Sequence, residues 1–582
     1  MTTSSPPSVR EQQALVFGHE RLVQTGAQEA AFVDWLRSVG TLAVDTETTG
    51  LRWSDTPRLV VFADTTQAWC VPAENESLIG YALELADTLV FHNAGYDIRM
   101  LNKIEGISVG WDRVQDTYIL AHLHKSDQVL GLKPLMQKYL DQPPAEQDLL
   151  KRAMRKLKVD WATVPIDLPE YVDYACMDGV GTARLYEALT PLLDDDQLFI
   201  AEKEHYIARL CWEREQAGML VDVEYALSLK AEWQARILEL VDKMAKWGVV
   251  NPNANRDVER VLREQGWTPT LFTANGQAQL DREVLVVLAQ EFELAEALIE
   301  YKRLAKWSTA YIDGVLDNLD DQNYVHASIN GLKAKTGRMS ISRPPLQQLP
   351  SSDSTIRSMF IAPPGQVIVS ADFSQVEPRV AAALSQDQRM IQFLTQSEVK
   401  FHSLTARRLF GVDQESARQY SIGKAIGLGV LYAKGSKSIA RETGVSDTIA
   451  EGLVEGFWSI YPDLRRWDRK NRSDAKKGRP VHSLWGRPLS PHAPYAATNA
   501  IVQGGAGEVF KDATFRLWGA GLLEYALLPI HDEWLFSVPT ADPEGFLADV
   551  KQAMETTIRG VPIVVETEVY GSSWGEGYKN KG

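Results

Sequence analysis

The hydrophobic pattern of the chain changes near residue 200, and this change most restricts the folds that the sequence can adopt. Before it, short apolar runs such as TLAVDTE and TLVFHN alternate with helical patterns such as VGTARLYEALTPLL, which is typical of an α/β domain. After it, two long stretches carry apolar residues at three- and four-residue spacing and predict a mainly helical region. With 582 residues, the chain is long enough for about four folding units.

The second half of the chain mixes strand-like and helical segments. The Gly/Ser/Pro-rich stretch TGRMSISRPPLQQLP is followed by the strand-like QVIVSADFS, and helical patterns then continue to about residue 475. After a turn at WGRPLSP and one more helix come two further apolar runs, LLPIHDEWLFSV and PIVVETEVY. The whole sequence therefore predicts a multidomain protein, with an α/β domain followed by an α+β region.

Composition restricts the cellular setting more than it restricts function. The sequence has no run of about 18 uninterrupted apolar residues and no basic-then-apolar leader, so we expect a soluble, cytoplasmic protein without a membrane partner. The net charge of -16 is unusual for a nucleic-acid-binding protein, but a channel can be basic while the exterior is acidic. The three cysteines lack CxxC spacing, which argues against disulfides and structural zinc.

Acidic residues in the first third of the chain fall at spacings that suit a metal ion. Asp45 and Glu47 lie two residues apart on a predicted strand, so their side chains share one face. Asp97 lies in a predicted helix, and Tyr174 and Asp178 lie one helical turn apart in another. A DxE pair alone is weak evidence, because most such pairs are solvated strand ends. Together the three segments supply hard oxygen ligands suited to Mg²⁺ or Mn²⁺.

A second group of carboxylates interrupts apolar strands in the later part of the chain. Asp372 ends one predicted strand, and Glu377 follows it by five residues. Asp532 and Glu533 interrupt the apolar run LLPIHDEWLFSV. Like charges at semi-buried strand tips are unfavourable unless a cation binds there. The sequence therefore predicts a second two-metal site.

Between these carboxylates in the sequence lies a glycine-containing segment, YSIGKAIGLGVLYAKG. As a helix it places Lys424, Leu428 and Tyr432 on one face, because they are spaced by four residues. A lysine is a compact point charge that suits a triphosphate. This helix is a candidate for binding a nucleotide.

The order DTE, NxxxD and YxxxD in the first third resembles the three exonuclease motifs of the DnaQ-like family, which removes the terminal nucleotide from a 3′ end. The resemblance implies an RNase H-like fold and two divalent metal ions. It implies that Asp45, Glu47, Asp97 and Asp178 bind these metals, that Glu47 takes part in catalysis, and that Tyr174 orients the attacking water.

The remaining motifs resemble those of family A DNA polymerases, the family of bacterial DNA polymerase I and several phage replicative enzymes. They include TGRMS, LQQLP, NAIVQGGAGEVFKDA and SSWGEGY. The resemblance implies a right hand with an antiparallel palm sheet, helical fingers and a helical thumb. The expected domains are an exonuclease domain at 1–197, a thumb at 198–330, a palm at 331–390 and 490–582, and fingers at 391–489.

The family pattern assigns roles to individual residues. Asp372 and Asp532 are expected to bind two Mg²⁺ or Mn²⁺ ions, with support from Glu533. Lys424 is expected to grip the phosphates of the incoming dNTP, and Glu377 to exclude a ribose 2′-OH. Contacts to the triphosphate, the primer terminus or the minor groove of the primer-template are expected from Arg338, Gln375, His402, Tyr432, Asn499, Gln503 and His531.

Three positions depart from the family pattern. Leu428 stands where the family has Phe or Tyr, and Tyr420 stands where it has an Arg, which leaves Arg418 as the nearest guanidinium. Lys400 replaces an acid two residues before His402. Arg418 and Lys400 are the two candidates for the phosphate contact that the missing Arg would make, and Lys400 is favoured. These departures put nucleotide binding in question, so a 3′→5′ exonuclease with a degenerate, DNA-binding polymerase half is the alternative.

The expected partners are primer-template DNA, a single-stranded DNA 3′ end and dNTPs, bound by a monomer. The sequence does not identify a processivity partner. It begins directly at the exonuclease motifs, without a 5′ nuclease domain, which favours a phage replicative enzyme that works in the host cytoplasm.

Overall fold

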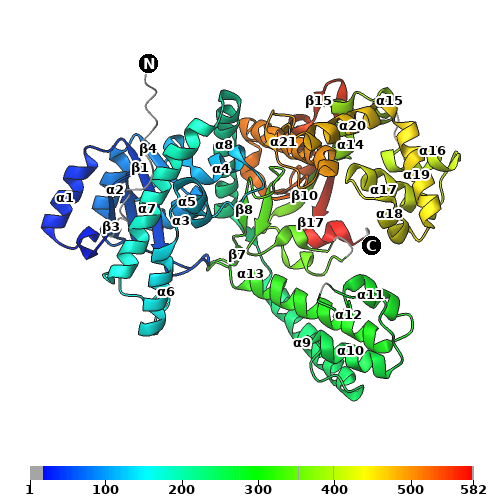
Figure 1. Ribbon diagram of the computed structural model, residues 1–582, viewed down its shortest axis with the longest axis horizontal. Helices are drawn as coiled ribbons and strands as arrows, with labels where there is room; N and C mark the ends of the chain where they lie inside the picture. The colour runs from blue at the N-terminus through cyan, green and yellow to red at the C-terminus, as the bar shows by residue number, and fades with distance from the viewer. Residues whose placement is uncertain (1–16, 274, 351–352, 397–398, 580–582) are drawn as a thin grey trace.

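The structure is a computed structural model, and it describes residues 17–273, 275–350, 353–396 and 399–579. The chain forms an elongated molecule (Figure 1) with the amino-terminal α/β domain at one end of its long axis. The helices of residues 388–460, in yellow, lie at the opposite end, and a helical arm of residues 223–306, in green, projects from the middle.

The amino-terminal domain is built on a mixed five-stranded sheet in the order β3-β2-β1-β4-β5. Its central strand β1 runs antiparallel to β2 and parallel to β4. The strands are β1 (Thr41–Thr48), β2 (Pro57–Ala63), β3 (Ala68–Pro72), β4 (Thr88–Phe91) and β5 (Val114–Asp116). The helices of this domain are α1 (Gly26–Leu36), α2 (Glu76–Leu85), α3 (Ala94–Leu101), α4 (Thr117–His124), α5 (Leu132–Leu140), α6 (Ala145–Leu157) and α7 (Pro169–Leu189).

Helices cover both faces of this sheet, and β1 contributes to both cores. Leu42 and Val44 pack with α1, α2 and α3, whereas Ala43 packs with α6 and α7. Successive residues of a strand point to opposite faces. Asp45 and Glu47 therefore face α7, on the same side as Ala43.

A long helix, α8 (Asp195–Ala217), leads from this domain into the helical arm. The arm contains α9 (Val223–Lys246), α10 (Asn255–Glu264), α11 (Arg282–Leu288), α12 (Glu293–Lys306) and α13 (Gly314–Leu316). Short strands then return the chain to the body of the molecule: β6 (Met219–Leu220) with β7 (Tyr324–Val325), and β8 (Ser328–Asn330) with β9 (Ser340–Ser342).

The body is an antiparallel sheet in the order β13-β14-β10-β17. Its strands are β10 (Gln366–Phe373), β13 (Ala526–Ile530), β14 (Glu533–Pro539) and β17 (Val565–Gly571). Its helices are α14 (Val376–Ser385), α21 (Ala497–Gly519) and α22 (Pro543–Met554). The predicted α+β region is thereby confirmed, with a sheet assembled from strands that are far apart in the sequence.

The segment between α14 and β11 is helical and stands beside this sheet (Figure 1). It consists of α15 (Gln388–Gln396), α16 (Phe401–Phe410), α17 (Ala417–Leu431), α18 (Ser436–Thr443), α19 (Asp447–Ile460) and α20 (Pro462–Lys476). Two short ribbons complete the fold, β11 (Val481–His482) with β12 (Pro488–Leu489) and β15 (Thr556–Ile558) with β16 (Val561–Ile563). Among the helices that the structure describes, none has the length and apolarity needed to cross a membrane.

Candidate active sites

The first site lies between β1 and α7. Asp45 and Glu47 reach it from β1, and Asp178 reaches it from α7, because these faces pack together. Carboxylate oxygens of the three residues all lie within 4.8 Å of one another. Only 6% of Glu47 and 6% of Asp178 is exposed, so water screens their mutual repulsion poorly.

The electrostatics of this cluster favour a bound cation. Burial, reinforced by the neighbouring carboxylates, raises the pKa of Asp45 and of Glu47 well above the ordinary values. A divalent ion relieves both effects, because it replaces lost hydration and opposes the like charges. Three oxygen donors in this geometry fit a hard cation such as Mg²⁺ or Mn²⁺.

Asp97 lies next to the cluster but is held differently. It projects from α3, and its Oδ1 accepts hydrogen bonds from Thr46 N at 3.0 Å and Thr46 Oγ1 at 2.6 Å. Burial raises the pKa of Asp97 to about 7, against the effect of these two bonds. The structure thus brings three of the four predicted carboxylates together and places Asp97 beside them. It acts on Asp45 through its charge, which helps to raise the pKa of Asp45.

Tyr174 stands one turn before Asp178 on α7, as predicted. Its ring lies 4.7 Å from Nζ of Lys133, a residue of α5 that also forms an ion pair with Asp178. Sequence reasoning missed Lys133, since a single lysine in a helical pattern carries no spacing signal. Buried carboxylates favour a nearby positive charge, so the predicted acidic cluster was the one available signal for a cationic residue such as Lys133.

The second site lies at the tips of β10, β13 and β14. Asp372 is near the end of β10 and pairs in register with Glu533, the first residue of β14. His531 and Asp532 form the turn between β13 and β14, with His531 in the left-handed region at φ 59°. The carbonyl oxygen of Asp532 accepts a hydrogen bond of 3.1 Å from Phe373 N, which fixes the turn against β10.

The two acids of the β13–β14 turn differ in their surroundings. Glu533 Oε1 accepts hydrogen bonds from Ser370 Oγ and, at 2.9 Å, from Tyr570 OH. Burial raises the pKa of Asp532, whereas the guanidinium of Arg338 acts in the opposite direction. Asp532 is thus a half-buried acid that lines the cleft, whereas Glu533 is buried and bonded to its neighbours in the sheet.

Glu377 lies in the first turn of α14, where only 6% of the residue is exposed. Its Oε1 accepts a hydrogen bond of 2.6 Å from Arg338 Nη2, which also lies 3.5 Å from Asp532 Oδ2. The side chain of Tyr432 adjoins Glu377 from the end of α17. Arg338 therefore links Asp532 of the β13–β14 turn to Glu377 of α14.

The helical segment closes the cleft on its other side. The predicted residues that line this cleft are Arg338, Asp372, Gln375, Glu377, His402, Leu428, Tyr432, His531, Asp532 and Glu533. The exposed Lys424 stands one turn before Leu428 on the same face of α17. Ten predicted residues from separate segments thus meet in one cleft.

Close packing of α16 against α17 sets the position of His402. A Cβ atom at Gly423 would lie 2.5 Å from Cβ of Ala406, and one at Gly427 would lie 3.2 Å from Nδ1 of His402. These glycines let the two helices approach. Burial, together with the charges of Lys424 and Lys400, lowers the pKa of His402 to about 4.

Other predicted residues lie around the cleft. Gln375 Oε1 accepts a hydrogen bond of 2.6 Å from Phe401 N, which links the start of α14 to the start of α16. Asn499 and Gln503 line a neighbouring pocket, one turn apart on α21. Arg418 is exposed in the first turn of α17, and Lys400 is exposed immediately before α16.

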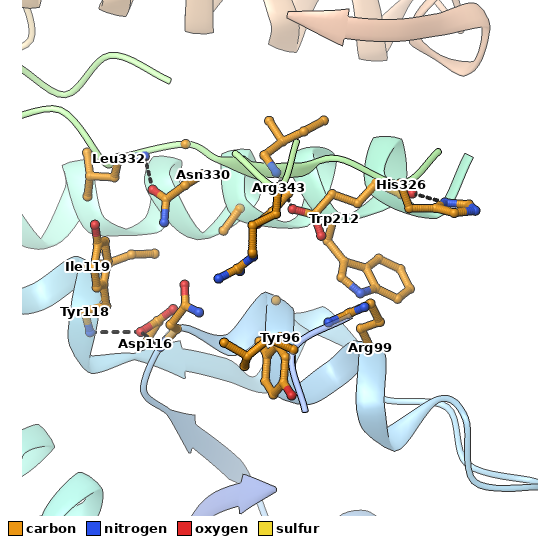
Figure 2. Close-up of a pocket in the computed structure, with 18 of the residues that line it drawn as sticks. Tyr96, Arg99, Asp116, Tyr118, Ile119, Trp212, His326, Asn330, Leu332 and Arg343 are labelled. Carbon is orange, nitrogen blue, oxygen red and sulfur yellow. Dashed lines mark hydrogen bonds between the residues drawn. The ribbon is translucent and has the colours of Figure 1, made fainter. Parts of the chain in front are cut away.

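A cavity separates the amino-terminal domain from α8 and the β8–β9 region. Tyr96, Arg99 and Asp116 line it from one side, and Trp212 and Arg343 from the other. Figure 2 shows Arg343 reaching into the cavity toward the side of Asp116 and Tyr118. Tyr96 lies directly before Asp97 on α3.

Comparisons with known proteins match both halves of the chain. Residues 223–576 match the family described as DNA polymerase family A, and residues 21–194 match the family described as 3′-5′ exonuclease. A DNA polymerase of Mycobacterium phage D29 is 34% identical over 584 residues, covering 94% of this chain and 95% of that protein. DNA polymerase I of Chloroflexus aurantiacus is 29% identical, covering 83% of this chain and 54% of the bacterial protein.

A solved structure shares the fold over nearly the whole length. The POL domain of Pol1 from M. smegmatis, in complex with DNA primer-template and dNTP, has a TM-score of 0.77 at 21% identity. The match covers 95% of this chain and 99% of that one. The match to DNA polymerase family A includes the cleft between β10, α14 and α17, and the match to the 3′-5′ exonuclease family includes the Asp45, Glu47 and Asp178 cluster. The chain therefore belongs to family A of the DNA polymerases and carries a 3′-5′ exonuclease domain.

Proposed function

We propose that this polymerase extends a primer 3′-OH on a DNA template at the cleft around Asp372 and Asp532. One observation carries this assignment. Asp372 and Asp532 line the same cleft at adjacent strand tips, and Lys424 lines a second pocket that shares Leu428 and Tyr432 with that cleft. Bound Mg²⁺ or Mn²⁺ ions supply activation of the attacking oxygen and neutralisation of charge on the leaving group. Asp372 and Asp532 are the residues we assign to hold them.

The remaining residues of the cleft position the substrates. Lys424 and Lys400 both act electrostatically on His402, so they place positive charge where a triphosphate needs it. Glu377, fixed by Arg338, presents a wall beside the sugar and excludes a 2′-OH. Glu533 keeps the strand tip rigid through its bonds to the sheet.

Contacts to the DNA come from the palm side of the cleft. We assign Asn499, Gln503 and His531 to the primer terminus, and Gln375 and Arg338 to the nucleotide or the minor groove. The acceptors of the minor groove are nearly the same for every base pair, so such contacts check pairing without reading sequence. This suits an enzyme that copies any template. The boundaries proposed for its domains remain 1–197, 198–330, 331–390, 391–489 and 490–582.

We assign removal of the 3′-terminal nucleotide to Asp45, Glu47 and Asp178, with Asp97 as a fourth acid beside them. Tyr174 is the residue that orients the attacking water. The phage relatives support a replicative enzyme that works in the cytoplasm of an infected bacterium, and we expect it to act as a monomer.

One primer-template with a labelled primer tests both activities. With dNTPs and Mg²⁺ or Mn²⁺, we expect the primer to lengthen to the end of the template. Without dNTPs, we expect it to shorten from its 3′ end, and chelation of the metal should stop both reactions. Shortening without extension under any metal would instead support an exonuclease with a degenerate polymerase half.

A further inference from the structure

A buried lysine stands inside the acidic exonuclease site. Lys133 projects from α5, and only 12% of its side chain is exposed. Its Nζ forms an ion pair with Asp178 Oδ1 and lies 2.5 Å from Glu146 Oε1, at the start of α6. An ammonium ion thus occupies the edge of a cluster suited to divalent ions.

The two partners of Lys133 differ in what else they contact. Asp178 belongs to the three-carboxylate cluster with Asp45 and Glu47. Glu146 is also buried, with 7% exposed, but it lies outside that set and is paired with Lys133. The ammonium also lies 4.7 Å from the centroid of the Tyr174 ring, at cation–π distance. Lys133 therefore joins a metal-ligating acid, a non-ligating acid and the water-orienting tyrosine.

We propose that Lys133 is a positioning residue of the exonuclease site that competes with a divalent ion for Asp178 and keeps Tyr174 in place through its anchor on Glu146. In the metal-free protein its charge neutralises the buried acids. When a divalent ion takes Asp178, Glu146 retains the ammonium under the tyrosine ring. This inference rests on the proposed exonuclease site, and it assigns to Glu146 the role of holding the lysine.

Three substitutions separate these roles. Lys133→Met keeps the length of the side chain and removes its charge, so a divalent ion meets less repulsion and binds more tightly. Glu146→Gln removes the competing partner, so Lys133 pairs more firmly with Asp178 and the ion binds more weakly. If Glu146 acts only through Lys133, Glu146→Gln has no further effect once Lys133→Met is present. Lys138→Met removes a charge from the exposed side of the same helix and is the matched control.

The test is a Mn²⁺ binding titration on the full chain with the polymerase site silenced by Asp372→Asn and Asp532→Asn. We expect Lys133→Met to lower the Mn²⁺ dissociation constant by about fivefold or more, Glu146→Gln to raise it, and Lys138→Met to leave it within about twofold. In single-turnover assays at saturating Mn²⁺, Lys133→Met should degrade a single strand at least about tenfold more slowly, because Tyr174 loses its support. Lys133→Arg, which keeps the charge, should recover part of that rate.

Primer extension by Lys133→Met in the otherwise unchanged chain should equal wild type, which shows that the variant folds. Unchanged or weaker Mn²⁺ binding by Lys133→Met would overturn the competition with metal. An unchanged rate at saturating Mn²⁺ would overturn the positioning of Tyr174. Failure of the proposed exonuclease site itself looks different, because the wild-type chain would then show no Mn²⁺-dependent degradation.

Discussion

Replacement of Lys400 by alanine tests how this polymerase holds a triphosphate without the arginine that Tyr420 replaces. Lys400 and Lys424 flank His402, and both charges help to lower its pKa to about 4. Lys400 is exposed before a nucleotide binds, so its phosphate contact should fall at the lower end of the charge-assisted range, about 1.5 kcal/mol. This corresponds to a loss of about tenfold in kcat/KM for the nucleotide.

Steady-state single-nucleotide insertion measures this loss, and Arg418→Ala is measured beside Lys400→Ala because Arg418 is the other candidate for the phosphate contact. Arg418 is exposed in the first turn of α17, and we expect its removal to change kcat/KM by less than about twofold. Degradation of a single strand by Lys400→Ala should equal wild type. Removing Lys400 should also raise the pKa of His402, which NMR of the imidazole can follow. A kcat/KM within about twofold of wild type for Lys400→Ala would refute the assignment.

Three further predictions concern other positions. Glu377→Ala should raise ribonucleotide insertion by about a decade or more, because the buried wall beside the sugar is removed, and competition between ribo- and deoxynucleotides measures it. Leu428 offers no hydroxyl near the sugar, so wild type should use dideoxynucleotides poorly and Leu428→Tyr should use them better in chain-termination assays. Burial raises the pKa of Glu215 to about 7, so stability should fall as pH rises from about 4.5 to 7, because the folded state keeps a proton that the unfolded state has lost. Glu215→Gln should make this fall smaller by up to about 3 kcal/mol, while the other buried acids keep their share, and urea unfolding of both proteins at pH 5 and pH 8 checks it.

The sequence predicted the part of the first carboxylate cluster that depends only on strand geometry. Residues two apart on a strand share a face, so Asp45 and Glu47 had to point together, and the structure aims them at α7. Asp97 was less predictable, because its helix packs on the other face of the sheet and Thr46 takes one of its oxygens. Which face a helix covers is a tertiary property that local spacing does not contain.

In the second site, residues far apart in the sequence could be grouped only through the resemblance to family motifs. The pairing of Asp372 with Glu533 joins strands about 160 residues apart, and periodicity cannot specify such a pairing. The break at 289–292 between α11 and α12 was not predicted either, since the apolar spacing runs through it. Lys133 and its partner Glu146 carry no motif, and only the packing of α5 and α6 around α7 reveals them.

We propose that the two acidic sites perform separate reactions, and one experiment with a labelled primer tests this division. A labelled primer with a mismatched 3′ end is used to follow shortening, and the same primer with a matched 3′ end is used to follow extension. We predict that Asp45→Ala with Glu47→Ala abolishes shortening while extension of a matched primer persists. Asp532→Ala should abolish extension while shortening persists. Loss of both activities from either variant, in a protein that remains folded, would contradict the account.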